Sequence, residues 1–247
     1  MKRLEGKIAV VTGGSRGIGA VIAKELGREG ATVIINYNDS HKLAQEVVEE
    51  IKAMGSTAIA LQANIAKAEP TKALIDEVLE KFGRIDILVN NAGITRDRTF
   101  NKMSFEEWHL VIDTNLSSVF NTCMVAVPAM LEQKYGRIIN ISSVIGQAGG
   151  FGQSNYASAK AGMIGFTKSL ALETARKGVT VNAICPGFIG TDMVNDMPVN
   201  VQETIIAQIP MKKLGEPIEV AKGVIFICES EYMTGQCLNL NGGLHMI

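Results

Sequence analysis

Short apolar runs alternate along the chain with longer segments in which apolar residues recur every three or four positions. The short runs are nearly continuous stretches rich in Val and Ile, as expected of strands buried on both faces of a sheet. The longer segments have the period of amphipathic helices. The strand-like runs occupy residues 8–12, 32–36, 57–64, 85–93, 136–143, 179–187 and 237–243, and the helical segments occupy 19–30, 41–55, 70–83, 104–134, 154–176 and 218–230.

This strict alternation predicts an α/β fold, a doubly wound parallel sheet of about seven strands with helices on both faces. No linker, repeat or low-complexity tract interrupts the pattern. We therefore expect residues 1–247 to form a single three-layer domain. Residues 191–210 are less regular and rich in Met, Asn and Pro, so they are the best candidate for a substrate lid.

Several helix boundaries carry local signals. Gly30 and Gly55 follow two of the predicted helices, as glycine commonly does at a helix C-terminus. Pro70 lies near the start of the third helix, where the missing N–H is tolerated. Ser104 and Glu107 have the spacing of a capping box, which predicts a helix that starts at Ser104.

Composition narrows the range of functions by exclusion. The chain has 247 residues, of which 47% are hydrophobic and 20% charged, which is enough for one large core. The net charge of -1 favours neither a nucleic-acid nor a membrane partner. No apolar run reaches the length expected of a membrane span. Glu5 interrupts the N-terminal apolar run, which ends in glycines, so we interpret it as a first strand and expect a cytoplasmic protein.

Cysteine and histidine are placed without the spacing of a metal site. The four cysteines form no CxxC pair, and the three histidines are scattered. The pattern therefore predicts no metal, and free thiols suit a reducing cytosol. We expect the cysteines to behave as small buried apolar residues.

The segment TGGSRGIG, residues 12–19, connects the first strand to the first helix. Gly13, Gly17 and Gly19 would permit a tight turn and close backbone approach to a pyrophosphate, and the helix N-terminus would supply amide donors. The spacing is GxxxGxG rather than the more common GxGxxG. A purely structural turn is the alternative, but the position after the first strand favours a dinucleotide site.

The end of the second strand bears on which dinucleotide is bound. An acid there would bind the ribose 2′-hydroxyl of NADH, but the sequence is Asn36-Tyr37-Asn38, with no acid before Asp39. Arg16, in the glycine turn, offers a guanidinium to a 2′-phosphate. These residues favour NADPH/NADP+ over NADH. Residues 36–40 could equally be a polar turn before the next helix, and an inward-turned Asp39 would weaken the preference.

Tyr156 and Lys160 stand four residues apart in a predicted helix, which places them on one face. A neighbouring ammonium favours the phenolate, so we expect Lys160 to lower the pKa of Tyr156 from its usual value of about 10. Such a phenol could serve as an acid near neutral pH. The spacing alone is common, and a packed Tyr beside a solvated Lys is the structural alternative.

Several motifs occur in one order along the chain. They are TGGSRGIG (12–19), NNAG (90–93), Asn115 in a long predicted helix, ISS ending at Ser143, YASAK (156–160) and PGFIGT (186–191). In this order and spacing the whole chain resembles the short-chain dehydrogenase/reductase family. The resemblance implies a Rossmann-like fold and oxidation or reduction with a nicotinamide cofactor.

The resemblance also assigns catalytic roles. Tyr156 would protonate the carbonyl oxygen during reduction, and Lys160 would lower the Tyr156 pKa and bind the nicotinamide ribose. Ser143 would hydrogen-bond the substrate oxygen, and Asn115 would hold a water through which protons reach Lys160. Preorganised donors and a proton are what a carbonyl oxygen needs as hydride arrives at its carbon. Taken singly, Ser143 could be a strand-end hydroxyl and Asn115 a helix residue that bonds its own backbone.

By the same resemblance, further residues would surround the ligands. The family often has Asp at the position of Asn64, which can still accept or donate a hydrogen bond. Phe151, Gln153 and Phe188 would flank the acyl-pantetheine entrance, although such residues are often only packing. The expected cofactor-binding residues are Gly13, Ser15, Arg16, Gly17, Ile18, Gly19, Tyr37, Asn38, Asn64, Ile65, Asn91, Ala92, Gly93, Tyr156, Lys160, Pro186, Gly187, Ile189 and Thr191; those for substrate are Ser143, Phe151, Gln153, Tyr156 and Phe188.

Within the family, the chain is most similar to reductases of 3-oxoacyl thioesters. The stretches NAGITRDRTFNKM, IGQAGGFGQSNY and LNGGLHM resemble reductases of acetoacetyl-CoA, which make (R)-3-hydroxybutyryl-CoA for polyhydroxyalkanoate (polyhydroxybutyrate) synthesis. Lys134 and Lys177 stand where reductases of 3-oxoacyl-[acyl-carrier-protein] in fatty-acid synthesis have basic residues, and carrier proteins are acidic. This second function therefore stays open.

Two further alternatives share the fold. A nucleotide-binding sensor would need no tetrad, yet Asn115, Ser143, Tyr156 and Lys160 are all present. A hydroxysteroid or sugar-alcohol dehydrogenase would share all four and differ only in its pocket. The family resemblance also implies a homotetramer, with the long helices of residues 104–134 and 154–177 packed across a subunit interface.

Overall fold

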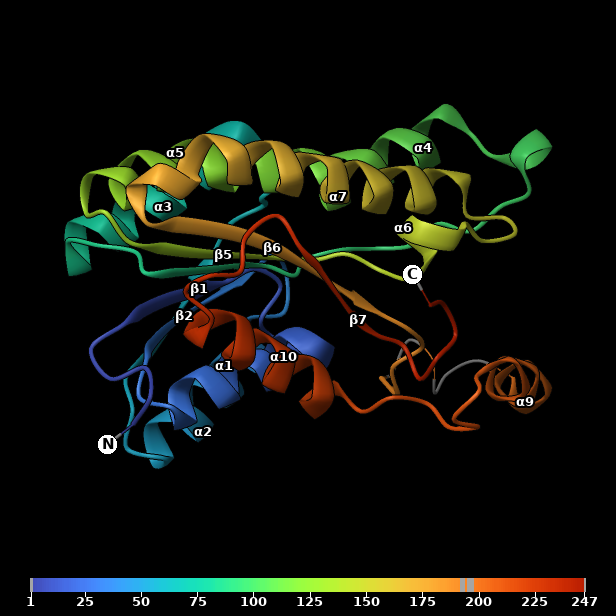
Figure 1. The fold of residues 1–247 in the computed structure, drawn as a ribbon, viewed down its shortest axis with the longest axis horizontal. Coiled ribbons are helices and arrows are strands. Elements are labelled where there is room, and N and C mark those ends of the chain that lie inside the picture. Colours follow the sequence, from blue (N-terminus) through green and yellow to red (C-terminus); the bar gives the residue numbers. More distant parts are fainter. Residues whose placement is uncertain (1, 192–193, 195–197, 247) are drawn as a thin grey trace.

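A seven-stranded parallel sheet forms the centre of the molecule (Figure 1). The computed structural model describes residues 2–191, 194 and 198–246. The strand order is β3-β2-β1-β4-β5-β6-β7, and every neighbouring pair is parallel, as predicted. The strands are β1 Ile8–Val11, β2 Thr32–Tyr37, β3 Ala58–Gln62, β4 Ile87–Asn90, β5 Gly136–Ile141, β6 Val179–Pro186 and β7 Cys237–Leu240.

Helices cover both faces of this sheet (Figure 1). One face packs against α1, α2 and α10, and the other against α3, α5 and α7. Every residue of the central strands β1, β4, β5 and β6 is buried, which explains why their sequences are mostly apolar. The helices are α1 Gly17–Arg28, α2 His41–Ala53, α3 Ala68–Phe82, α4 Phe105–Ile112, α5 Ser118–Glu132, α6 Ile145–Ala148, α7 Ser154–Thr174, α9 Val199–Gln208 and α10 Pro217–Glu229.

The predicted helix signals are largely present. The capping box exists, because the Ser104 hydroxyl accepts from Glu107 N and the Glu107 carboxylate accepts from Ser104 N. Gly30 and Gly55 have positive φ angles of 97° and 79°, which favour glycine. Helix α3 begins two residues before Pro70 rather than at it, so Pro70 still lies in the first turn, where no N–H is required.

The long helix predicted for residues 104–134 is interrupted. A π-helical segment, Asp113–Ser117, separates α4 from α5 and contains Asn115. The helical periodicity of the sequence does not distinguish such a short segment from regular helix, because five residues are too few to define a period of their own. Likewise, the helix predicted for residues 154–176 ends at Thr174 and continues as the short 3₁₀ helix Ala175–Lys177.

The region predicted to be irregular, residues 191–210, contains the ten-residue helix α9. The expectation of irregular structure was therefore wrong for Val199–Gln208. The apolar residues of this helix are not arranged as a buried stripe, and none of its residues is fully buried, so its periodic signal is weak. Residues 192–193 and 195–197 of the expected lid lie outside the described residues, and the lid stays a prediction.

One helical stretch, Phe105–Glu132, is long and apolar enough by length and composition to cross a membrane, which the sequence analysis did not anticipate. In the structure this stretch packs on the sheet together with α3. Its residues Val119, Cys123, Ala126 and Met130 belong to the core. Core packing thus accounts for part of its apolarity, while Phe105, Phe120 and Met124 of the same stretch are exposed.

Candidate active site

The glycine turn and the NNAG segment pack directly against each other at the carboxyl ends of β1 and β4. Gly13 and Gly17 have positive φ angles of 60° and 55°. The Asn91 side-chain amide donates to Thr12 O at 2.9 Å and Gly13 O at 3.1 Å. A Cβ atom on Gly13 would lie 2.9 Å from Ala92 Cα, so only glycine fits there.

Thr12 connects these two segments, a role that sequence analysis missed. Its hydroxyl oxygen accepts hydrogen bonds from Asn91 N at 3.0 Å and Ala92 N at 3.1 Å. Thr12 is buried at the end of β1. The available signal was a hydroxyl residue at the end of an apolar run, a position where a side chain can satisfy backbone groups that leave the sheet.

Gly19→Ala is expected to disrupt this turn and weaken cofactor binding by at least about tenfold. A Cβ atom at Gly19 would lie 2.4 Å from both Asn91 Nδ2 and Gly13 O. Gly13 O is a backbone atom, so the backbone of the turn would have to shift to relieve the clash. Titration of NADPH by its fluorescence measures the effect. Gly165→Ala is the control, because a Cβ there meets nothing within 4 Å and a mid-helix alanine adds about 0.5–1 kcal/mol of stability. Equal NADPH affinity in both variants would contradict the assignment.

The N-terminus of α1 fits a dinucleotide phosphate. Arg16 precedes the helix with an extended backbone, no side chain of the described residues caps the helix, and its first turn contains no acid. Its first backbone N–H groups are therefore free to bind an anion. The expected residues Ser15, Gly17, Ile18 and Gly19 lie in this turn or in the first turn of α1.

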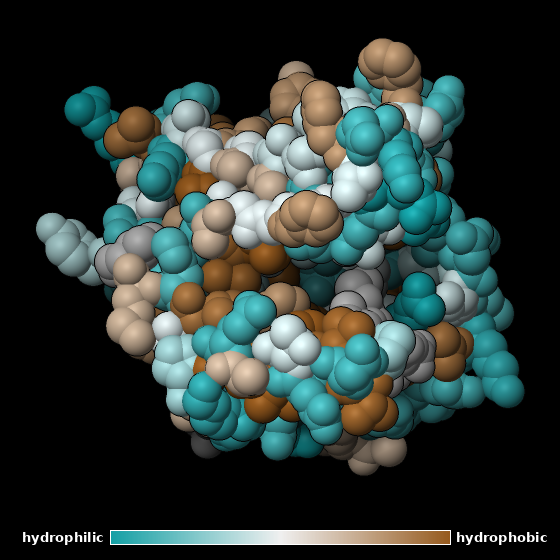
Figure 2. All heavy atoms as spheres, turned by 90° about the vertical axis from the view of Figure 1, so that its right-hand side faces the viewer, coloured by the Kyte–Doolittle hydropathy of each residue, from teal (hydrophilic) through white to brown (hydrophobic). Residues whose placement is uncertain are grey.

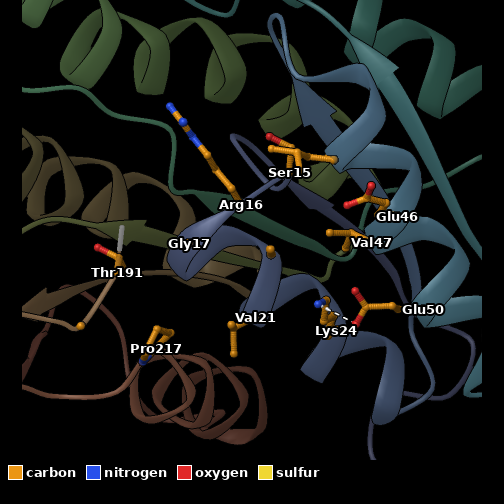
Figure 3. Close-up of a pocket in the computed structure, with 13 residues that line it drawn as sticks. Ser15, Arg16, Gly17, Val21, Lys24, Glu46, Val47, Glu50, Thr191 and Pro217 are labelled. Carbon is orange, nitrogen blue, oxygen red and sulfur yellow. Dashed lines mark ion pairs between the residues drawn. The ribbon is translucent and has the colours of Figure 1, made fainter. Parts of the chain in front are cut away.

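A cavity of about 360 Å³ lies on the outer side of α1, between α2 and α10 (Figure 3). Ser15, Arg16, Gly17 and Thr191 line one end of it, while the Lys24–Glu50 ion pair, at 2.6 Å, lies at the other. It includes none of the four tetrad residues. Arg16 is exposed and extends away from the Lys24–Glu50 pair (Figure 3), so its guanidinium is available to a phosphate.

At the end of β2, polar side chains bind one another. The Tyr37 hydroxyl and His41 Nδ1 are 2.7 Å apart, and Asn38 Nδ2 donates to Asp39 Oδ2 at 2.6 Å. Asn36 is buried and donates to Ala63 O at 3.0 Å, so its role is structural. Asp39 is exposed and bound by Asn38. Tyr37 is the last residue of β2 and Asn38 follows it, and their contact with a cofactor stays a prediction.

The turn after β3 places the next pair of predicted cofactor residues. Asn64 is exposed, and its Oδ1 accepts from Ala66 N at 3.1 Å in a local turn. Ile65 is buried, and its carbonyl oxygen accepts from Asn121 Nδ2 at 3.1 Å. The amide at position 64 thus shapes the turn in the way a carboxylate would.

Three of the tetrad residues meet near the carboxyl end of β5. Ser143 follows the strand, and Tyr156 and Lys160 lie in the first two turns of α7. Lys160 is buried, and its ammonium donates to Ile141 O at 2.7 Å and lies 5.6 Å from the centre of the Tyr156 ring. The Ser143 hydroxyl oxygen accepts from Ile145 N at 3.1 Å. The chain thus brings an acid, a hydroxyl and an ammonium to one place.

The expected lowering of the Tyr156 pKa was wrong for this structure. Burial raises the pKa of Tyr156, with a smaller rise from the Asp97 carboxylate, and a hydrogen bond with Ser143 only partly opposes it. Burial also lowers the pKa of Lys160 to about 8. The reason is that desolvation acts on both groups, whereas the spacing in sequence shows only their proximity. A raised pKa keeps the phenol protonated, as a proton donor requires.

Asn115 is buried beside this group and has both ends of its side chain occupied. Its Oδ1 accepts from Ile94 N at 2.8 Å, and its Nδ2 donates to Ile94 O at 2.9 Å. A Cβ on Gly93 would lie 3.2 Å from Asn115 Oδ1 and 3.6 Å from Lys160 Nζ. Asn115 therefore fixes the backbone after NNAG beside Lys160, and its role in holding a water stays a prediction.

The segment after β6 borders the same site. Val144 N donates to Pro186 O at 2.8 Å, and Gly187 N donates to Leu240 O at 2.9 Å, which ties this segment to the Ser143 loop and to β7. Phe188 and Ile189 line a second cavity of about 300 Å³ together with residues of β7 and the chain after α9.

Phe151 is 94% exposed, and Gln153 donates to Asp97 Oδ2 at 2.9 Å, so both lie at the rim of the site.

A buried polar chain supports the strand ends and was not predicted. Asn90 Nδ2 donates to Asn140 Oδ1 at 2.8 Å, and Asn140 Nδ2 donates to Thr167 Oγ1 at 2.8 Å. Thr122 Oγ1 donates to Asn90 Oδ1 at 2.7 Å. These contacts link β4 and β5 to α5 and α7.

The four cysteines are free thiols, and among the described residues no three His, Cys, Asp or Glu side chains are grouped as a metal site.

Comparison with known proteins shows which family the sequence matches. Residues 7–201 match the family model described as short chain dehydrogenase. The chain is 50% identical over 242 residues to a 3-oxoacyl-[acyl-carrier-protein] reductase of Staphylococcus aureus, covering 97% of this chain and 98% of the relative. It is 49% identical to a 3-oxoacyl-[acyl-carrier-protein] reductase of Synechocystis over the full length of both, and 46% identical to an acetoacetyl-CoA reductase of Cupriavidus necator over 97% and 98%.

Proposed function

Since the chain belongs to the short-chain dehydrogenase family, we propose that it is an NADPH-dependent oxidoreductase that reduces 3-oxoacyl thioesters. The preferred substrate is acetoacetyl-CoA, the product is (R)-3-hydroxybutyryl-CoA, and the product supplies polyhydroxyalkanoate synthesis. The observation that carries the proposal is the meeting of Ser143, Tyr156 and Lys160 at the end of β5. Relatives over 97% or more of the chain are reductases of such thioesters.

The residues have the groups that carbonyl reduction requires. When bound, NADPH would supply the hydride that the carbonyl carbon of the substrate takes up with its electron pair. The Ser143 hydroxyl and the Tyr156 phenol donate hydrogen bonds to the carbonyl oxygen, and Tyr156 transfers its proton to that oxygen, giving the alcohol. The resulting tyrosinate regains a proton from solvent by way of the Lys160 ammonium. A buried Lys160 whose pKa is about 8 can both hold and release that proton near neutral pH.

The preference for NADPH is supported by charge at the adenosine end. Arg16 is exposed, and Tyr37 and Asn38 replace the acid that would bind a free ribose 2′-hydroxyl. Asp39, the nearest carboxylate in sequence, is hydrogen-bonded to Asn38. The glycine turn, the NNAG segment and Thr191 would hold the rest of the cofactor.

The position of the basic residues shows where a carrier protein could bind relative to the site. Lys134 and Lys177 are exposed and lie two residues before β5 and β6, whereas Ser143 follows the other end of β5. A carrier protein bound at these lysines would lie at the opposite edge of the sheet from this chain's own Tyr156. Only a second subunit could bring the two together. Reduction of 3-oxoacyl-[acyl-carrier-protein] is the second candidate, supported by the relatives at 49% and 50% identity.

We also propose a cytoplasmic homotetramer. Large apolar side chains remain exposed on α5 and α7, which a subunit interface would cover. They are Phe120, Met124 and Leu172.

The deciding experiment measures kcat/KM for acetoacetyl-CoA and for acetoacetyl-carrier protein, each with NADPH and with NADH. We expect at least about a tenfold preference for the CoA ester and for NADPH, which corresponds to about 1.4 kcal/mol of transition-state stabilisation. A preference for the carrier protein would assign the enzyme to fatty-acid synthesis and make Lys134 and Lys177 the next residues to mutate. A preference for NADH would refute the role given to Arg16.

A further inference from the structure

Two loops form a single rim directly before Tyr156. We call residues 94–103 and 149–153 the entrance rim. Arg98 N donates to Gly152 O at 2.8 Å, and Asn155 Nδ2 donates to Arg96 O at 3.0 Å. Together with the Gln153–Asp97 bond, these contacts hold the two loops in a fixed relation to the start of α7.

The entrance rim carries more positive charge than its acids neutralise. Arg96, Arg98 and Lys102 are all exposed. Arg98 Nε pairs with Glu107 Oε1 at 3.3 Å, but no carboxylate of residues 2–191, 194 and 198–246 forms an ion pair with Arg96 or Lys102. The one acid within the rim, Asp97, accepts from Gln153. Two cations thus remain available to an anionic ligand.

Aromatic side chains project from the same rim. Phe151 is 94% exposed and Phe100 is 83% exposed, although phenylalanine is normally among the most buried residues. Figure 2 faces this end of the molecule and shows a central hollow bordered by both hydrophilic and hydrophobic side chains. Exposed aromatic rings beside unpaired cations are the groups with which proteins bind a nucleotide, because a base stacks on the ring while phosphates bind the cations.

We propose that the entrance rim binds the 3′-phosphoadenosine diphosphate part of coenzyme A, with Arg96 and Lys102 on the phosphates and Phe151 against the adenine. The inference rests on the proposed function. It adds the residues that would select a CoA thioester over a thioester of an acyl-carrier protein. Pantetheine separates the thioester from the nucleotide, so a thioester at Tyr156 leaves the nucleotide outside the site, where the rim lies. An acyl-carrier protein has the same pantetheine arm but neither the adenine nor the 3′-phosphate.

The test compares two substrates that differ only in the 3′-phosphoadenosine diphosphate group, acetoacetyl-CoA and acetoacetyl-pantetheine. In the double variant Arg96→Gln/Lys102→Gln, kcat/KM for acetoacetyl-CoA should fall at least about tenfold, mainly through KM, while kcat/KM for the short thioester changes less than about twofold. Phe151→Ala should behave in the same way. The matched control Lys134→Gln/Lys177→Gln removes the same number of positive charges at the other edge of the sheet and should leave both values unchanged. Added salt should raise KM for acetoacetyl-CoA and leave KM for the short thioester unchanged.

A second measurement does not depend on turnover. Adenosine 3′,5′-bisphosphate is titrated calorimetrically into the wild type and the rim variant, each saturated with NADP+ so that the cofactor site is filled. Binding to the wild type that is lost in the variant supports the rim. Equal binding, or no binding to either, overturns the inference, as does an equal loss of activity on both thioesters. If neither thioester is reduced by the wild type, the proposed function fails, whereas the titration still decides whether the rim binds the nucleotide.

Discussion

Replacing Tyr156 with phenylalanine will lower kcat for thioester reduction by about a thousandfold and leave NADPH affinity within about twofold of the wild type. The substitution removes only the hydroxyl, so the ring continues to pack beside Lys160. What is lost is the proton donor and one hydrogen bond to the developing oxyanion, both of which act in the transition state rather than in cofactor binding. Steady-state rates and NADPH fluorescence titration measure the two quantities.

Tyr135→Phe is the matched control. Tyr135 is held between the Lys7 ammonium, 3.7 Å from the ring centre, and Arg137, at 4.4 Å. These contacts need only the ring, and Tyr135 directly precedes β5, at the amino edge of the sheet. Its variant should therefore reduce substrate at the wild-type rate. If Tyr156→Phe did the same, Tyr156 would not be the acid, and a sensor that binds nucleotide without chemistry would become a serious alternative.

Lys160→Met will abolish most of the activity and yet make the protein more stable at pH 7, by about 2 kcal/mol. Burial lowers the pKa of Lys160 from its ordinary 10.5 to about 8, so at pH 7 the folded chain carries a desolvated ammonium. Methionine has similar length and no charge. The loss of the hydrogen bond to Ile141 O offsets part of the gain. Such a gain is common where function maintains an unfavourable group.

The pH dependence gives this prediction a distinct signature. Between about pH 8 and 10.5 the unfolded wild type still binds the Lys160 proton and the folded wild type does not, so this group makes wild-type stability rise with pH. The advantage of the variant should therefore shrink across that window. Thermal unfolding of both proteins at pH 7, 8.5 and 10 measures it. Lys168→Met, at an exposed position of the same helix, should change stability little at any pH. A variant less stable than the wild type at pH 7 would contradict the account.

The sheet could be predicted from sequence because its strands are buried on both faces. Short apolar runs such as those in Ile8–Val11 and Ile87–Asn90 are distinguished from buried helix by their length, their β-branched residues and the glycines that follow them. Helix α9 could not be predicted in this way, since its exposed surface leaves no periodic apolar stripe. The π-helical segment around Asn115 depends on tertiary contacts with Ile94, which periodicity does not encode.

The candidate site was predictable as a set of residues but not as an electrostatic environment. Motif order placed Ser143, Tyr156 and Lys160 together, and the structure brings them together. The direction of the Tyr156 pKa was predicted wrongly, because burial depends on the surrounding fold and not on the four-residue spacing. Thr12 was missed for a similar reason, since its role is to bind the backbone of a segment about eighty residues away in the chain.

The most direct test of the account uses NADPH carrying deuterium at the transferable position of the nicotinamide. The wild-type enzyme is incubated with this cofactor and acetoacetyl-CoA, and the product is analysed by mass spectrometry and by chiral chromatography. The account predicts (R)-3-hydroxybutyryl-CoA with deuterium on C3, the former carbonyl carbon. Cofactor oxidation without that product, or a product without deuterium on C3, would contradict the assignment of this site to hydride reduction of a 3-oxoacyl thioester.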